Sequence, residues 1–186
     1  MTKARDLASG GFGLVLIKPS TVVNGTDNGK GTVSFTGQST VSLNGCFNST
    51  YDNYKIVFEA DSSSGTGDIK IRFRTSGADN TSNVYYSARQ FNFAYNTSYF
   101  GDSVNPSTIS TPITGFDFNT RGCQAVLEVS GPNKAKGTFV KNLGNYGYVN
   151  LHSNITHDSA TQFDGISFIL GTGTMTGQVS VYGYNK

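Results

Sequence analysis

Apolar and polar residues alternate along much of the chain, and the clearest alternation lies in residues 53–75, "NYKIVFEADSSSGTGDIKIRFRT". A period of two predicts a β-strand with one buried face. Because two such runs flank a Ser/Gly-rich turn, the segment is expected to form a β-hairpin. Glu59 then lies near Lys70 as a cross-strand pair. The expected buried positions are Tyr54, Ile56, Phe58, Ile69, Ile71 and Phe73, and the expected outward cations are Lys55, Arg72 and Arg74.

Further strands are expected wherever the same pattern recurs between turn residues. Residues 31–45 predict two short strands about Gly37-Gln38, and Asn28-Gly29 is a hairpin-turn signal. Residues 83–95 predict one long strand or a bent one, and residues 123–130 predict a strand that buries Ala125, Leu127 and Val129. Two more pairs are expected: 137–142 with 146–152 around residues 142–145, and 165–170 with 177–184.

Eight to ten short strands with turns every eight to twelve residues predict an all-β fold. That spacing favours a two-sheet antiparallel β-sandwich, with a jelly roll as the expected form. The first residues mix charge with glycines before the first apolar run at 14–17. We therefore divide the chain into an extended N-terminal arm, residues 1–30, and a sandwich domain, residues 31–186.

The composition of the chain limits the kinds of partner that the protein is expected to bind. Charged residues make up 14% of the chain and the formal net charge is +2, which argues against a nucleic-acid partner, because such proteins carry a strongly basic face. The 10 Tyr and 13 Phe supply a core and argue against disorder. No apolar run reaches the length of a membrane span, so no membrane partner is expected.

Two cysteines, Cys46 and Cys123, lie far apart in the sequence and have no metal-ligand spacing. We expect two buried, reduced thiols of a protein that folds in a reducing cytosol. Whether the two side chains are close enough for a disulfide stays open at this point.

Candidate chemistry is sparse. His152 and His157 lie near Asp158 and Asp164, but the segment is expected to be a surface loop without a third strong ligand, so no metal site is predicted. Neither a nucleophile beside a base nor a carboxylate pair stands out. We therefore predict no catalytic residue, no cofactor and no enzymatic activity.

The aromatic-rich segment 84–100 allows two interpretations. Tyr95, Asn96 and Tyr99 are candidate glycan contacts, because Tyr and Asn in loops combine a flat apolar surface with hydrogen-bonding groups. In the alternative, Phe91, Phe93 and Tyr95 line one face of a sheet as core.

Three stretches together resemble virion structural proteins of tailed bacteriophages, marine ones in particular. These are "TKARDLAS" followed by glycines and "LVLIK" at the start, "FNSTYDNYKIVFE" in the middle, and "FDGISFILGTGTMTGQVSVYGYNK" at the end. The opening is similar to the start of tail-fibre and surface-appendage subunits. The resemblance covers about a third of the chain and implies no catalytic residue.

The resemblance implies a structural, non-enzymatic subunit exposed on the virion as a capsid decoration, a knob or a short fibre-like appendage, assembled in the host cytoplasm. Its N-terminal arm is expected to dock onto other capsid or tail subunits, and a homo-oligomer is expected, with a trimer favoured. The alternative is a receptor-binding tail-fibre or tip module that recognises a host-surface glycan. The expected docking residues of the arm are Lys3, Arg5, Leu7, Phe12 and Leu14.

Overall fold

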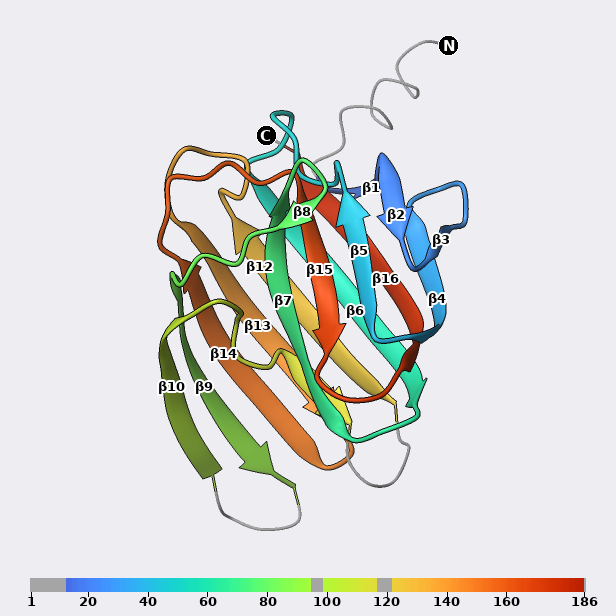
Figure 1. The fold of residues 1–186 in the computed structure, drawn as a ribbon, viewed down its shortest axis with the longest axis vertical. Coiled ribbons are helices and arrows are strands. Elements are labelled where there is room, and N and C mark those ends of the chain that lie inside the picture. The colour runs from blue at the N-terminus through green and yellow to red at the C-terminus, as the bar shows by residue number, and fades with distance from the viewer. Residues whose placement is uncertain (1–12, 95–98, 117–121, 186) are drawn as a thin grey trace.

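The computed structural model describes residues 13–94, 99–116 and 122–185. These residues form two facing antiparallel β-sheets, one of ten strands and one of six, and contain no helix (Figure 1). The apolar side chains of both sheets point into the space between them and make one core. The expected all-β antiparallel sandwich is confirmed.

The larger sheet is built from long strands joined in register. Its order from edge to edge is β10 (Tyr99–Ser107), β9 (Tyr85–Phe93), β14 (Val149–His157), β13 (Thr138–Tyr146), β12 (Cys123–Ser130), β6 (Asn53–Ser63), β16 (Met175–Tyr184), β4 (Thr32–Gln38) and β3 (Thr26–Asp27), with β1 (Leu14–Ile17) also paired to β16.

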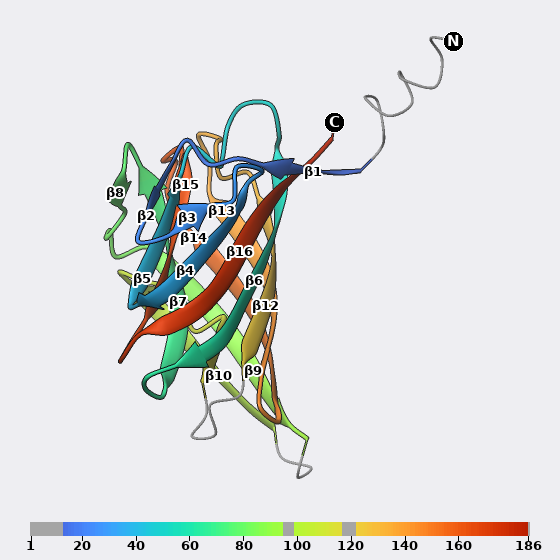
Figure 2. The same cartoon turned by 90° about the vertical axis from the view of Figure 1, so that its right-hand side faces the viewer.

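The smaller sheet covers part of the inner face of the larger one, as Figures 1 and 2 show. Its order is β11 (Thr114–Phe116), β7 (Gly67–Thr75), β15 (Gly165–Leu170), β5 (Thr40–Asn44) and β2 (Thr21–Val23), with β8 (Ala78–Asp79) paired to β7. Consecutive strands β4 to β7, and again β14 to β16, alternate between the two sheets. This alternation gives the sandwich its jelly-roll character.

Aromatic rings join the two sheets through the core. The ring of Phe58 on β6 stacks on that of Phe168 on β15, with centroids 5.0 Å apart, and also on Phe35 of β4. A second stack joins Phe73 on β7 to Tyr85 on β9, with centroids 6.3 Å apart. The facing sheets are therefore held together by large rings contributed from both sides.

The predicted hairpin in residues 53–75 is wrong as a pairing, although its strands and their buried positions are correct. The structure buries all six expected apolar side chains, but β6 belongs to the larger sheet and β7 to the smaller one. Glu59 therefore lies opposite Gln124 and Gln178 instead of Lys70. Alternation shows which side of a strand faces the core; it does not show which strand lies beside it.

The same error affects the last predicted pair, because β15 and β16 also lie in different sheets. The pair β13–β14 is confirmed, but its turn lies at Gly147-Tyr148 and not within residues 142–145. The Asn28-Gly29 turn is also confirmed: it joins β3 to β4, and Gly29 has a φ of 86°, a conformation that favours glycine.

The described part of the expected arm forms strands of the sandwich. Within residues 14–27, β1 pairs with β16, β2 with β5 and β3 with β4. The boundary expected at residue 30 therefore does not separate these strands from the sheets, and residues 1–12 lie outside the described residues. Docking by the arm stays a prediction.

No helix long and apolar enough to cross a membrane occurs in the part of the chain that the structure describes.

Candidate ligand-binding face

The outer face of the larger sheet presents side chains in straight rows that run across the strands. In-register pairing places one residue of each strand beside one residue of the next. Five neighbouring strands contribute to what we call the central row, which crosses the middle of the face. Its members, from β6 to β9, are Val57, Val126, Leu143, His152 and Gln90. Leu143 is 57% exposed, so this row offers apolar surface to solvent.

On one side of the central row lies what we call the amide row. The side-chain amides of Gln124, Asn145 and Asn150 are exposed and make no hydrogen bond to any other residue that the structure describes. They therefore present unused donors and acceptors to solvent. From β16 to β9 the row consists of Gln178, Glu59, Gln124, Asn145, Asn150 and Asn92.

On the other side lies what we call the charged row, which consists of Tyr182, Lys55, Glu128, Lys141 and Asn154. The Glu128 carboxylate lies 3.7 Å from the Lys55 Nζ and accepts a 2.6 Å hydrogen bond from the Tyr184 hydroxyl. That hydrogen bond raises the pKa of Tyr184. Both oxygens of Glu128 are therefore engaged within the protein.

Two hollows follow these rows and share Val126, Leu143 and His152. The first, of about 410 Å³, lies between the central and charged rows and includes Lys55, Glu128, Lys141 and Asn154 in its lining. The second, of about 320 Å³, lies between the central and amide rows. An apolar strip with polar groups on both sides is the usual composition of a small-molecule site.

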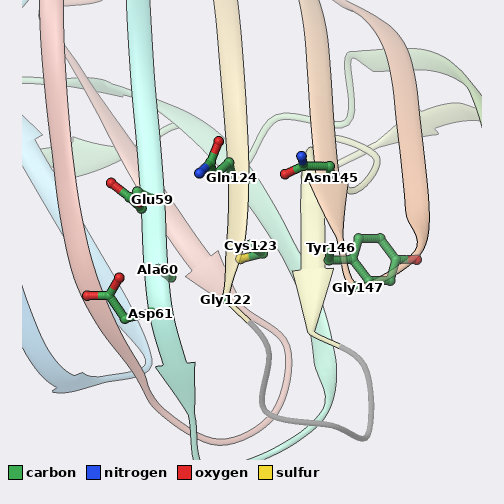
Figure 3. Close-up of a pocket in the computed structure, with 9 residues that line it drawn as sticks. All are labelled: Glu59, Ala60, Asp61, Gly122, Cys123, Gln124, Asn145, Tyr146 and Gly147. Carbon is green, nitrogen blue, oxygen red and sulfur yellow. The ribbon is translucent and has the colours of Figure 1, made fainter.

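A third hollow, of about 260 Å³, lies at the end of the sheet where β12 begins (Figure 3). Glu59 and Asp61 extend from β6 on one side of it, and Tyr146 lies on the other. Cys123 lines the hollow but is buried, and this burial raises the pKa of the thiol to about 12. The thiol is therefore protonated at neutral pH and is a poor nucleophile.

The two histidines lie on β14 and not in a loop, so that expectation is corrected. Their side chains point to opposite faces: His152 is exposed and His157 is fully buried. The strand period explains this, since the two positions differ by an odd number. Asp158 is exposed and Asp164 accepts a 2.9 Å hydrogen bond from the Ser76 amide. Among the described residues, no group of three His, Cys, Asp or Glu side chains is placed to hold a metal ion.

Most of the side chains predicted as contacts lie outside the described residues. These are Lys3, Arg5, Leu7 and Phe12 of the arm, and Tyr95 and Asn96 of the aromatic-rich segment. Leu14 begins β1 and is 43% exposed. The backbone of Tyr99 begins β10 opposite Asn92, at the end of the amide row.

Sequence reasoning missed the rows themselves. Outward positions of six separate strands carry the signal, but their alignment depends on a register that no local pattern contains. The predicted glycan contacts came from the aromatic-rich segment instead, because a local pattern identifies only residues that are close together in the sequence.

The arrangement of the strands in two facing sheets defines the class of the protein as an antiparallel β-sandwich. Comparison with solved structures finds only distant matches. A human SPRY domain aligns with a TM-score of 0.40 and 13% identity, covering 88% of this chain and 97% of that one. The galectin LEC-6 of Caenorhabditis elegans aligns with a TM-score of 0.40 and 11% identity, covering 80% and 94%. At these identities no residue role passes to this chain. No protein-family model and no curated protein matches the sequence.

Proposed function

We propose that this protein is a non-enzymatic subunit exposed on the surface of a tailed-phage virion and anchored through its N-terminal segment. The three sequence stretches at the start, middle and end of the chain carry this proposal. One feature of the fold supports it. Leu14 pairs with Tyr184, and the Asn185 amide donates a 3.2 Å hydrogen bond to the Gly13 carbonyl. The strand β1 thus lies beside β16, and four strands of the larger sheet separate β16 from β9 (Figures 1 and 2).

Deletion of residues 1–12 tests the anchoring role. The sandwich should melt at an unchanged temperature, because the paired strands begin at Leu14, while incorporation into particles should be lost. A matched control replaces residues 1–12 by a Gly/Ser segment of equal length, which separates the sequence of the segment from its length. Incorporation of the deleted protein at the normal level, measured by mass spectrometry of purified particles, would contradict the proposal.

A second role, recognition of a host-surface glycan, is favoured by the outer face of the larger sheet. Leu143 and Val126 supply apolar surface, and the amides of Gln124, Asn145 and Asn150 supply free hydrogen-bonding groups on one side of it. Sugars combine an apolar ring face with a rim of hydroxyl groups, so this pairing of a narrow apolar strip with amides fits them.

A glycan array tests this second role with the soluble protein. Binding should be lost in Leu143→Asp, which puts a carboxylate in the central row, and kept in Phe139→Asp, a change of an equally exposed apolar residue that lines neither hollow of the face. Equal binding by both variants, or no binding by the unchanged protein, would reject the outer face as a glycan site.

A further inference from the structure

We infer that the ligand of the outer face is an anionic oligosaccharide that lies across the strands along the central row, with its acidic group beside Lys141 and His152. This inference rests on the glycan-binding role proposed above. It adds the charge of the ligand, its direction on the sheet and the residues that receive its acidic group.

The charge follows from the groups around the hollow next to the charged row. Its lining contains the amines of Lys55 and Lys141, the imidazole of His152 and one carboxylate, that of Glu128. Glu128 is already engaged by Lys55 and by the Tyr184 hydroxyl. Lys141 forms no ion pair with any residue that the structure describes. The hollow therefore carries an uncompensated ammonium group, which favours an anion there.

The direction of the ligand on the sheet follows from the arrangement of the three rows. The central row runs from Val57 on β6 to Gln90 on β9 and crosses five strands, a span of about 19 Å at a strand spacing of ~4.8 Å. The amide row and the charged row accompany it on either side. An extended ligand along the central row therefore meets amides along one edge and Lys141 along the other, whereas a ligand parallel to the strands leaves the row after one residue.

The side chains of the outer face favour a saccharide over a polyanion such as a nucleic acid. A nucleic acid binds through many cations along its backbone. Among the described residues of the three rows there are two lysines, Lys55 and Lys141, and Lys55 is paired with Glu128. Uncharged amides predominate on the opposite edge, and they suit the hydroxyl groups of a saccharide. The face thus fits a chain with many hydroxyls and few negative charges.

Hexasaccharides that carry a single uronic acid among neutral sugars, each compared with its own methyl ester, test the inference. Esterification removes the charge and keeps the sugar. The acid form should bind about threefold to fivefold more tightly than the ester at low salt, the size of one exposed ion pair, and Lys141→Gln should abolish this difference while binding of the ester persists. Lys30→Gln is the matched control, because Lys30 is also exposed but lies in the turn between β3 and β4. Affinity should also rise from dimer to hexamer.

The possible outcomes distinguish failure of this inference from failure of the proposed glycan-binding role. Equal affinity for acid and ester, an effect of Lys30→Gln as large as that of Lys141→Gln, or binding of neutral glycans alone overturns the inference and leaves a glycan-binding protein. Failure to bind any glycan overturns the proposed role as well. Preference for the acid form that depends on Lys141 and weakens with added salt supports the inference.

Discussion

At the scale of single residues, His157 illustrates how neighbouring strands decide the role of a side chain. Its imidazole lies among the rings of Phe73, Tyr85 and Phe163, with centroids 6.0, 4.6 and 4.8 Å away, all in edge-to-face geometry. Its Nε2 lies 3.2 Å from the Asn80 Oδ1. Three rings and one amide make this histidine part of the core, although the sequence "HDSATQFD" suggests a surface loop.

This environment predicts a loss of stability in acid. Burial lowers the pKa of His157, so below the unfolded-state value of about 6.5 the unfolded chain binds the proton more readily than the folded one. The stabilising effect of the neutral ring is complete above that pH and falls as the pH drops through it, by at most ~1.4 kcal/mol per pH unit.

Urea unfolding between pH 7.5 and pH 5 measures this loss. In the unchanged protein the free energy of unfolding should fall as the pH is lowered. In His157→Leu it should be lower at pH 7.5 and should fall less steeply. His152→Gln serves as the control, because its exposed ring lies on the opposite face of the same strand. A slope that persists undiminished in His157→Leu would mean that other groups cause it.

At the scale of secondary-structure elements, the strands were predictable and their neighbours were not. Alternation in residues 53–75 identified both strands and the six expected apolar positions, all of which the structure buries, because burial on one face acts within a single strand. Pairing depends on contacts between strands distant in the sequence, and the turn between β6 and β7 carries the chain from one sheet to the other. The outer-face rows depend on the register of six strands at once, so they followed only from the structure.

Arg74 shows the same limit at the end of β7. Alternation places its side chain outside, yet the residue is 7% exposed. The strand β8 pairs with the end of β7, and the guanidinium of Arg74 pairs with Asp79 on β8 and donates hydrogen bonds to Ser42 and Ser167. These partners bury the arginine, and the short strand that supplies Asp79 has no sequence signal of its own.

Two substitutions on β7 test the assignment of its faces. Ile71 is fully buried, so Ile71→Asp should cost about 3 kcal/mol or more of unfolding free energy, because an unpaired carboxylate enters the core. Arg72 is partly exposed and donates a 3.0 Å hydrogen bond to the Thr108 carbonyl. Arg72→Asp should therefore cost about 1 kcal/mol. Urea denaturation measures both, and equal losses would show that the register of β7 is wrong.

At the scale of the whole molecule, the two cysteines are expected to become exposed in different events, one by local opening of the sheet and the other by global unfolding. Both are free and buried, which confirms the burial predicted from the sequence, and burial raises the pKa of each thiol to about 12. Cys46 lies in the core after β5, and its Sγ lies 3.7 Å from the Leu43 carbonyl oxygen. Cys123 is the first residue of β12 and borders the hollow at the end of the sheet.

Thiol labelling in low denaturant should therefore separate the two sites. Opening of the sheet end exposes Cys123 with little new surface, so its labelling rate should depend weakly on denaturant. Cys46 should label only through global unfolding, with the full denaturant dependence, and the variants Cys46→Ala and Cys123→Ala assign each rate. After complete denaturation without reductant, two labels per chain are expected. Equal dependences would show that the sandwich opens as one unit, and labels that appear only after reduction would reveal a disulfide.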